Sequence, residues 1–389
     1  MFGTDIAGRR FVVVTHVYAQ GPAFSLEEYL KEKVVSLVFI GHPFPFARDT
    51  RSFIRVYDQG RLTSEKTFRS WKGPDVTFYL KDIVVTLWWL LPMQRADYFV
   101  GADVLNAFAG ILLTWLGKVQ RVVFYTIDYI PRRFSNSLLN ALYHFLDRFV
   151  VRTVHRVWNL SPVMAEERGK RGVAQRYRGK QLTVPIGTAV VNSTSILHFD
   201  RHKIVFLGHL RAGQGVELLL EAMTEVVKSV PQAHMLLIGG GPLEQALRSL
   251  VVKLGLTRHV RFQGFVERFA DVQRLLQNAC FAVAPYLDTP ETFTRYADPG
   301  KPKDYLASGL PVVITKVPQI AFEIEAKRCG LAIDATKDDL VRALVRLLLD
   351  DDLVHEFRRN APRMAREYAW ERVFERALRD TVVAEEQHA

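Results

Sequence analysis

Residues 204–222 read IVFLGHLRAGQGVELLLEA, and this stretch decides the fold of the second half of the chain. It begins with a continuous apolar run, continues through Gly208, Gly213 and Gly215, and ends in apolar residues at helical spacing. A buried strand that turns through glycine into a helix is the repeating unit of a doubly wound parallel sheet. The glycines let backbone N–H groups approach a phosphate, and the start of the helix favours negative charge. The same glycines also suit a plain strand–helix connection, so this loop alone does not decide between the two.

The alternation of strand and helix continues in both directions from this stretch. Continuous apolar strands that alternate with helices predict parallel sheets covered on both faces. The predicted fold class is therefore α/β, with two Rossmann-like doubly wound domains whose strand ends face a cleft. A linker is predicted within residues 185–200, and one polar helical region from residue 362 to 386. The predicted strands are residues 10–16, 34–42, 98–100, 121–126, 157–160, 204–210, 234–240, 260–265, 281–285 and 311–315.

Two further loops follow strands of the second half. The run GGGP at residues 239–242 lacks the glycine spacing of a dinucleotide fingerprint, and this disfavours an NAD site. In YADPGKPKDYLASGLPVVIT, residues 296–315, a turn at residues 298–300 precedes a short helix. Lys301 and Asp304 share one face of that helix. A cation at a helix N-terminus opposes the helix dipole, so a bound anion explains Lys301 better than a plain surface position does.

Composition limits the class of protein. The 389 residues include only two cysteines, Cys280 and Cys329, and neither belongs to a CxxC pair. The sequence therefore predicts neither a disulfide framework nor a zinc site, and it favours a reducing compartment. The longest apolar segments, residues 83–91 and 104–116, are shorter than the roughly 20 residues that span a bilayer. We expect no transmembrane helix and no signal peptide.

The net charge of +11 is unevenly distributed along the chain. Residues 1–195 hold 26 Lys and Arg against 15 Asp and Glu, whereas residues 196–389 hold 26 of each kind. Such a one-sided field indicates an anionic partner, such as lipid headgroups or a phosphorylated carrier, although it can also serve solubility alone. The arginines are scattered and no nucleic-acid module is recognised, so nucleic acid is not expected as a partner. The candidate residues for a membrane surface are Arg132, Arg133, Arg148, Arg152, Arg156 and the basic residues of 168–180, with Trp88 and Trp89 as interfacial aromatics.

Taken together, these loops resemble those of glycosyltransferases of the GT-B fold, in particular the retaining glycosyltransferase family 4 (group 1) type. The resemblance covers nearly all of residues 200–380, and residues 1–195 match more loosely. It implies an acceptor-binding domain over residues 1–195, a nucleotide-sugar domain over residues 196–368, and a terminal helix, residues 369–389, that returns to the first domain. The segments that carry the resemblance are GHLRAGQGVELLLEA (208–222), GGGP (239–242), VRFQGFV (260–266), KDYLASGLPVV (303–313), AWERVFE (369–375), residues 20–22, FYTIDYIPRRF (124–134) and residues 157–162.

The resemblance also implies roles for individual residues. The loop at residues 208–215 and the amides at residues 300–301 would hold the donor diphosphate, and Asp304 would accept hydrogen bonds from the nucleotide ribose. Asp298 would face the transferred sugar, and Asp128 would present a polar group to the reacting centre. The implied donor-binding residues are Gly21, Gly208, His209, Gln214, Gly215, Gly241, Phe265, Val266, Gly300 and Asp304, and the implied catalytic residues are Asp128, Arg211, Asp298 and Lys301.

The sequence departs from the family pattern at the positions of two cations and of one acidic residue. The family has Arg and Lys where this chain has His209 and Gln214, and a glutamate where it has Tyr296. We expect Arg211 and Lys301 to supply the missing positive charge to the leaving diphosphate. Two alternatives stay open: a GT-B nucleotide-sugar epimerase, and a non-catalytic GT-B protein that acts as a binding partner.

The expected function is transfer of a hexosyl group from a nucleoside-diphosphate sugar to a glycan or lipid-linked acceptor, with retention of configuration. The reaction would belong to polysaccharide or glycolipid biosynthesis. The nucleotide sugar is a co-substrate, and the family generally needs no metal or other cofactor. The expected location is the cytoplasm, with peripheral attachment to an anionic membrane surface at the inner face of the cell membrane.

Overall fold

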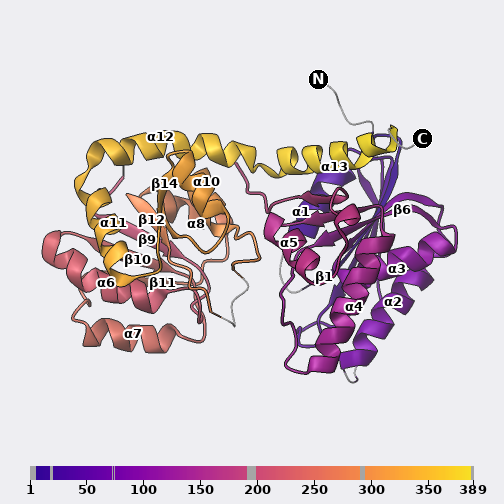
Figure 1. The fold of residues 1–389 in the computed structure, drawn as a ribbon, viewed down its shortest axis with the longest axis horizontal. Helices are drawn as coiled ribbons and strands as arrows, with labels where there is room; N and C mark the ends of the chain where they lie inside the picture. The colour runs from indigo at the N-terminus through magenta and orange to yellow at the C-terminus, as the bar shows by residue number, and fades with distance from the viewer. Residues whose placement is uncertain are drawn as a thin grey trace. The chain divides into compact units, whose positions relative to one another are not determined.

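The chain folds into two compact units (Figure 1). The first unit comprises residues 1–185 and 370–389, and the second comprises residues 186–369. Each unit contains one sheet with helices packed on it, which confirms the predicted fold class of two Rossmann-like α/β domains. The computed structural model describes residues 6–17, 21–71, 73, 75–190, 199–289 and 294–386. Gln20 and residues 191–198 of the predicted linker lie outside these ranges.

The sheet of the first unit has eight strands. They are β1 (Arg10–Val17), β2 (Ser36–Pro43), β3 (Phe53–Asp58), β4 (Arg61–Thr67), β5 (Ala96–Ala102), β6 (Val119–Thr126), β7 (Arg156–Asn159) and β8 (Gln181–Thr183). Their order is β4-β3-β2-β1-β5-β6-β7-β8, and β1 pairs in parallel with both β2 and β5. The direction in which successive strands are added therefore reverses between β1 and β5. The central strands are almost wholly buried, as expected of parallel strands with both faces covered.

The antiparallel hairpin of β3 and β4 was not predicted. Its turn contains Gln59 and Gly60, with φ angles of 46° and 82°, which is the left-handed backbone that tight hairpins favour. β4 reads RLTSEKT and is largely exposed, so it lacks the apolar run by which the other strands were recognised.

Among the residues that the structure describes, six α-helices belong to this unit. They are α1 (Pro22–Lys31), α2 (Asp75–Leu90), α3 (Val104–Trp115), α4 (Ser137–Thr153), α5 (Pro162–Lys170) and α13 (Trp370–Glu386). α2, α3 and α4 cover one face of the sheet, with α3 in contact with both of its neighbours (Figure 1). α13 packs on α1 through Phe374 and Tyr29, whose ring centroids are 5.6 Å apart. The hydroxyl of Thr381 in α13 accepts a 3.0 Å hydrogen bond from the buried indole of Trp158 in β7.

The sheet of the second unit is wholly parallel. Its strands are β9 (Lys203–Leu207), β10 (His234–Ile238), β11 (Val260–Gly264), β12 (Phe281–Ala284), β13 (Val312–Thr315) and β14 (Gly330–Ile333). The order is β11-β10-β9-β12-β13-β14, so the reversal lies between β9 and β12. The helices are α6 (Val216–Ser229), α7 (Glu244–Lys253), α8 (Phe269–Gln277), α9 (Lys301–Ala307), α10 (Ile320–Ala326), α11 (Lys337–Leu349) and α12 (Asp351–Glu367). Separate apolar cores fill the two sides of this sheet.

Two boundaries differ from those predicted. The second unit begins at Ile186 rather than after residue 195, because the Ile186 N–H donates to the Asp298 carboxylate over 2.6 Å and the Thr188 hydroxyl donates to Asp304 over 2.8 Å. The predicted helical region at residues 362–386 is divided between α12 and α13, which belong to different units. Within the described residues, no helix is long and apolar enough to cross a membrane.

Candidate functional site

The reversal of strand order in the second unit brings together the loops that follow β9 and β12. Gly215, directly before α6, has a φ of 70°, and a Cβ atom there would lie 1.8 Å from the Pro285 carbonyl oxygen. The Leu287 N–H donates to the Gly213 carbonyl over 3.0 Å. Doubly wound sheets bind ligands outside the carboxyl ends of their strands at such a reversal. The predicted glycine loop thus occupies the position at which this class of sheet binds a ligand.

The loop after β10 packs against the same glycine loop. Gly239 has a φ of 127°, and a Cβ atom there would lie 2.0 Å from the Gly208 carbonyl oxygen. A Cβ atom at Gly241 would lie 2.4 Å from the carbonyl oxygen of Leu210. The Leu210 N–H donates to the Gly240 carbonyl over 3.0 Å, which fixes the two loops to each other. Glycine is required here because the backbones themselves are in contact.

Lys301, the first residue of α9, directs its ammonium group to the glycine loop. Its Nζ donates to Oε1 of Gln214 over 2.7 Å and would lie 2.4 Å from a Cβ atom placed on Gly208. Burial, reinforced by the charge of Arg211, lowers the pKa of Lys301 to about 8. A bound anion would favour the protonated ammonium group, so this surrounding suits a phosphate. The predicted Gly208, Gln214 and Lys301 are thus brought together, and Gln214 orients the cation instead of supplying one.

Tyr305 fixes α9 relative to the end of β9. Its hydroxyl accepts the Leu207 N–H over 2.7 Å and donates to the Leu207 carbonyl over 3.2 Å. The residue is 1% exposed, so this double hydrogen bond is shielded from water. Sequence reasoning missed Tyr305, because an aromatic residue on the buried side of a short helix gives no signal beyond core packing.

Asp304 lies one turn after Lys301 and is partly buried. Its Oδ1 accepts the Thr188 hydroxyl over 2.8 Å. Burial raises the pKa of Asp304 to about 6, although the hydrogen bond from Thr188 and the charges of Lys303 and Lys301 oppose the rise. The carboxylate therefore has one oxygen engaged by Thr188 and remains ionised at neutral pH.

Asp298 has a different environment from the one implied by the resemblance. It is 8% exposed, and its Oδ2 is bound by the backbone N–H of Ile186 and by the buried ammonium group of Lys303. Lys303 also donates to the Ile186 carbonyl over 2.6 Å. These contacts attach the start of the second unit to α9. This geometry gives Asp298 a role in holding α9, and we propose no catalytic step for it.

The remaining predicted residues of the second unit surround the same loops. Arg211 is exposed, and His209 has a pKa lowered by burial and by the charges of Arg211 and Lys301, so its ring is neutral. Gly300 precedes α9, where a Cβ atom would lie 3.3 Å from the Ile186 side chain. Phe265 directly follows β11 and is 79% exposed, with Val266 half-buried beside it. An exposed aromatic ring at the carboxyl end of a strand is free to stack on a planar ligand.

Gly21 and Asp128 belong to the first unit. Gly21 precedes α1, and its carbonyl oxygen accepts the Phe24 N–H over 3.0 Å. Asp128 follows β6 and forms a half-exposed 3.0 Å ion pair with Arg133. The roles that the resemblance implies for Gly21 and Asp128 stay predictions.

Sequence reasoning missed a buried polar cluster at the strand reversal of the first unit. His16, near the end of β1, lies 2.5 Å from the Asp103 carboxylate through Nδ1 and 3.2 Å from Asp82 through Nε2. Asp103 also caps α3, because its Oδ1 accepts the N–H groups of Leu105 and Asn106. Burial disfavours the imidazolium ion, but the two carboxylates outweigh it and raise the pKa of His16 to about 10. His16 is therefore a cation held between two carboxylates.

The same cluster extends into β2 and α2. Asp82 pairs with Lys81 over 2.7 Å and lies 3.3 Å from Nδ1 of His42. The ring of His42 bonds to the hydroxyls of Ser52 and Thr86 at 2.9 and 2.8 Å, and burial lowers its pKa to about 3. No group of three or more His, Cys, Asp and Glu side chains in the described part of the chain is arranged to hold a metal ion. Histidines at strand ends were the signal available in the sequence, but their partners are tens of residues away.

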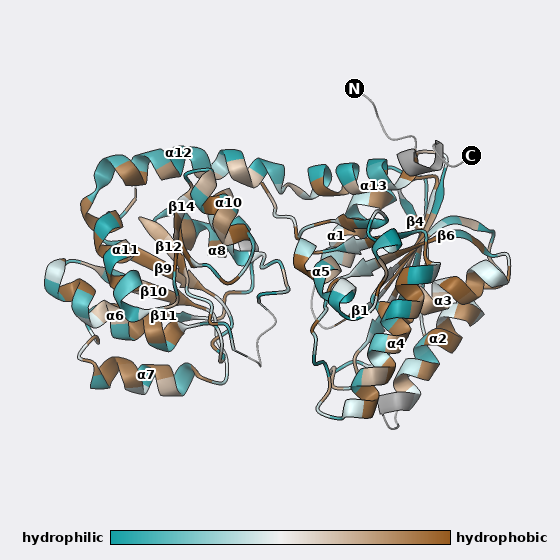
Figure 2. Cartoon of the chain, in the orientation of Figure 1, coloured by the Kyte–Doolittle hydropathy of each residue, from teal (hydrophilic) through white to brown (hydrophobic). Residues whose placement is uncertain are grey.

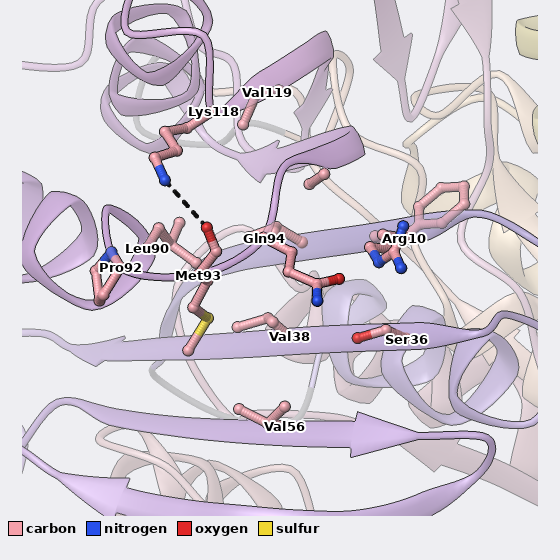
Figure 3. A pocket seen from close by; sticks show the side chains of 13 residues that line it. Arg10, Ser36, Val38, Val56, Leu90, Pro92, Met93, Gln94, Lys118 and Val119 are labelled. Carbon is pink, nitrogen blue, oxygen red and sulfur yellow. Dashed lines mark hydrogen bonds between the residues drawn. The ribbon is translucent and has the colours of Figure 1, made fainter.

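A cavity of about 340 Å³ lies at the opposite, amino-terminal edge of the first sheet (Figure 3). Arg10 at the start of β1 and Lys118 beside the start of β6 border it, and Val38, Leu90 and Met93 are among its apolar walls. Lys118 donates to the Met93 carbonyl over 3.2 Å, as drawn in Figure 3. Because ligands of doubly wound sheets bind at the carboxyl ends of strands, we do not assign the predicted site to this cavity.

Comparison with known proteins finds a family that matches the part of the chain containing the glycine loop. Residues 201–350 match the family described as glycosyl transferases group 1. The chain is 30% identical over 220 residues to the D-inositol 3-phosphate glycosyltransferase of Corynebacterium jeikeium, covering 52% of this chain and 45% of that protein. It is 26% identical over 160 residues to the GDP-mannose-dependent alpha-(1-6)-phosphatidylinositol monomannoside mannosyltransferase of Mycolicibacterium smegmatis, covering 39% and 40%. These matches span less than half of each relative.

The solved structures extend the similarity to the whole fold. HepE of Anabaena in complex with UDP superimposes with a TM-score of 0.68 at 12% identity, covering 98% of this chain and 100% of that one. Sucrose-phosphate synthase of Thermosynechococcus elongatus gives a TM-score of 0.67 at 16% identity, covering 98% and 99%. At these identities the likeness concerns the fold. The chain therefore has the GT-B fold, and its residues 201–350 match the family described as glycosyl transferases group 1.

Proposed function

We propose that this protein is a glycosyltransferase that transfers a hexosyl group from a nucleoside-diphosphate sugar to a glycan or lipid-linked acceptor, with retention of configuration. The observation that carries the proposal is Lys301, whose Nζ lies at the glycine loop, bonded to the neutral Gln214 and close to Gly208. This cation stands at the strand reversal of the domain that matches group 1 glycosyltransferases.

The donor diphosphate would bind between Lys301 and the start of α6. Gly215 lacks a capping side chain, so the first N–H groups of this 14-residue helix have no side-chain acceptor at its cap. Arg211, exposed in the same loop, adds positive charge. Asp304 would accept the ribose hydroxyls with the carboxylate oxygen not bonded to Thr188, and the exposed ring of Phe265 would stack on the base.

The chemical step requires stabilisation of growing negative charge. The bond between the anomeric carbon and the diphosphate oxygen breaks, and its electron pair stays on the diphosphate. The acceptor oxygen bonds to the same face of that carbon, and its proton passes to an oxygen of the departing diphosphate. Lys301 and Arg211 would stabilise the leaving diphosphate from fixed positions. His209 is neutral and adds a hydrogen-bond donor without a further positive charge.

The acceptor would be held by the basic first unit. Residues 1–195 carry the whole net charge of +11, which favours a phosphorylated or otherwise anionic acceptor. Relatives named above act on inositol 3-phosphate and on a phosphatidylinositol mannoside, as their names state. With such an acceptor, the proposed reaction would belong to glycolipid or polysaccharide biosynthesis, in the cytoplasm and at the inner face of the cell membrane.

A panel of nucleotide sugars tests this function. UDP-, GDP- and ADP-sugars are added separately to the full chain, and thermal unfolding is followed. A donor at about 100 times its Kd should stabilise the native state by about 2.7 kcal/mol. The stabilising donor is then incubated with candidate acceptors, and release of the nucleoside diphosphate and the anomeric configuration of the product are measured.

The possible outcomes separate the alternatives. Transfer or slow hydrolysis with retained configuration supports the proposal. Release or interconversion of the sugar without transfer points to an epimerase. Donor binding with no turnover points to a non-catalytic GT-B protein, and the absence of any stabilisation across the panel contradicts the donor site.

A further inference from the structure

The helix α2 has its polar and apolar residues on unexpected sides. Its only charged residues between positions 77 and 91, Lys81 and Asp82, are buried in the polar cluster of the first unit. Its outward side carries Leu80, Val84 and Trp88, which are 59%, 63% and 60% exposed. Their spacing of four residues aligns them along one ridge of the helix. A helix on the surface of a soluble domain normally shows the reverse distribution.

The helix α4 presents a second apolar ridge. Leu138, Leu142 and Phe145 are 80%, 61% and 60% exposed and recur at helical spacing. The only acidic residue of α4, Asp147, is 1% exposed and is paired with the buried Arg168. The exposed side of α4 therefore offers no negative charge.

The helix α3 connects these two ridges, because it packs against both α2 and α4. Its sequence, VLNAFAGILLTW, contains no charged residue, and Trp115 at its end is 64% exposed. Figure 2 shows hydrophobic residues along all three helices. Soluble proteins seldom expose large apolar side chains side by side on this scale without a partner. We call the outward side of α2, α3 and α4 the three-helix face.

The residues around the three-helix face indicate which kind of partner binds to it. The three helices are followed by β5, β6 and β7, which are neighbours in the sheet. The C-terminal ends of the helices therefore lie together, at the edge of the sheet where these strands begin. Trp88 and Trp115 lie toward that edge, where Arg95, Lys118 and Arg152 also stand. Tryptophan and basic residues beside an aliphatic surface are the composition of a protein surface that enters the boundary of headgroups and acyl chains.

A second copy of the chain fits the three-helix face less well. Pairing of two such faces would bury the apolar ridges, but the described residues of the three helices expose no carboxylate that could meet the cations of the other copy. An anionic bilayer satisfies both features, because it accepts apolar side chains and attracts basic residues.

We infer that the three-helix face docks the first unit onto an anionic lipid bilayer, with Leu80, Val84, Leu138, Leu142 and Phe145 entering the acyl boundary. The inference goes beyond the proposed transfer reaction, since lipid binding needs neither donor nor turnover. It also replaces a purely electrostatic attachment by one in which apolar insertion and attraction to anionic lipid are both needed.

Cosedimentation of the full chain with vesicles tests the inference. The two vesicle types are phosphatidylcholine alone and phosphatidylcholine mixed with phosphatidylglycerol. Binding should require the anionic lipid and weaken as salt rises toward physiological ionic strength. Each apolar side chain removed from the acyl boundary costs roughly tenfold in affinity, so Val84→Glu combined with Leu142→Glu should weaken binding at least about 100-fold.

Matched controls come from the second unit. Val252 and Leu349 are each 67% exposed, close to the exposure of Val84 and Leu142, so Val252→Glu combined with Leu349→Glu adds the same charges elsewhere. This control should lower affinity several-fold at most. Fluorescence of Trp88, obtained by difference from Trp88→Phe, should shift to shorter wavelength on anionic vesicles only.

Several results would overturn the inference. They are equal binding to neutral vesicles, no binding to either type, equal weakening by the control pair, or a concentration-dependent dimer that Val84→Glu with Leu142→Glu dissociates. These measurements contain no nucleotide sugar, so their outcome does not depend on whether the transfer assay succeeds.

Discussion

The partner of Lys301 explains how a partly buried cation remains available to a ligand. Its Nζ bonds to the neutral amide of Gln214, 87 residues away along the chain, rather than to a carboxylate. A carboxylate in that place would cancel the charge, and a lysine at position 214 would repel it. Gln214 therefore holds Lys301 in place and leaves its charge available.

Replacing this cation should affect turnover far more than folding. Lys301→Ala is expected to lower the rate of sugar transfer about 100-fold or more, since it removes fixed charge from the leaving diphosphate, and Arg211→Ala should act in the same direction. The measurement is steady-state transfer at saturating donor, with circular dichroism to confirm folding. Lys253→Ala, an exposed lysine at the end of α7, is the control. Turnover within a few-fold of the parent in both site variants would remove this charge-stabilisation role.

The pH dependence of donor binding should also depend on Lys301. Burial lowers its pKa from 10.5 to about 8, so below pH 8 it is charged in the free protein and above pH 8 it is neutral. A bound diphosphate favours the charged form, so donor affinity should fall up to about tenfold per pH unit above pH 8. Calorimetric titration at several pH values checks this result, and Lys301→Ala should lack the decline.

The same lowered pKa has the opposite effect on the stability of the free protein, to which Lys301 contributes more as pH rises. Between pH 8 and 10.5 the unfolded chain binds the lysine proton and the folded chain does not, so this group stabilises the fold as pH rises. An alkaline loss of donor affinity accompanied by a similar loss of stability would indicate general unfolding instead.

Sequence reasoning could predict candidate site residues but not their contacts. Gly208, Gly215 and Lys301 were predicted because glycine turns and helix starts are local features. The bond from Lys301 to Gln214 and the burial of Asp298 against Lys303 depend on side chains brought together by the fold, which no local pattern records.

At the scale of elements, the polar cluster of the first unit joins β1, β2 and α2. Asp82 of α2 lies within 3.3 Å of His16 in β1, of Lys81 in its own helix and of His42 in β2. One carboxylate thus balances buried positive charge contributed by separate elements. Its position also explains why α2 can hold two charged residues on its inner side.

Removal of this carboxylate should destabilise the first unit strongly. Asp82→Ala leaves Lys81 and the imidazolium of His16 buried with less compensation, and the expected cost is about 3–5 kcal/mol of unfolding free energy. Urea unfolding, monitored through hydrogen exchange of backbone amides in the first unit, measures the loss of unfolding free energy. Asp58→Ala, at the exposed end of β3, should change stability by less than about 0.5 kcal/mol. A comparably small loss in Asp82→Ala would show that the cluster does not hold these elements together.

The success of the fold prediction differed among elements for a physical reason. Strands such as β1, β9 and β13 are buried on both faces, so burial forces a continuous apolar run that the sequence displays. The exposed strand β4 is held by pairing to β3 and needs no such run. The joint between α12 and α13 is also set by packing on different units rather than by a strong local stop signal.

At the scale of the whole molecule, the chain passes from one unit to the other twice. It leaves the first unit after Pro185 and re-enters it at Trp370, where α13 begins. Phe374 and Thr381 of this helix are 0% exposed, and Val373 and Leu378 are also buried. α13 therefore completes the core of a unit whose other residues precede it by almost half the chain.

Deletion of residues 370–389 should unfold the first unit selectively. Loss of a buried Phe alone costs about 3–5 kcal/mol, and the helix contributes several more buried side chains to a typical total stability of about 5–15 kcal/mol. Limited proteolysis with mass spectrometry should show cleavage throughout residues 6–185 and protection of residues 199–369. A truncated chain in which both units resist the protease would mean that α13 is dispensable.

The late position of α13 has a consequence for the order of events during synthesis. A ribosome has produced all of residues 186–369 before it reaches Trp370, so the second unit can finish folding while the first still lacks one helix. Domains that are continuous in sequence usually fold in the order in which they emerge. Here the unit that emerges first is completed last, and until then the surface of α1 that receives Phe374 stays open to chaperones and to other nascent chains.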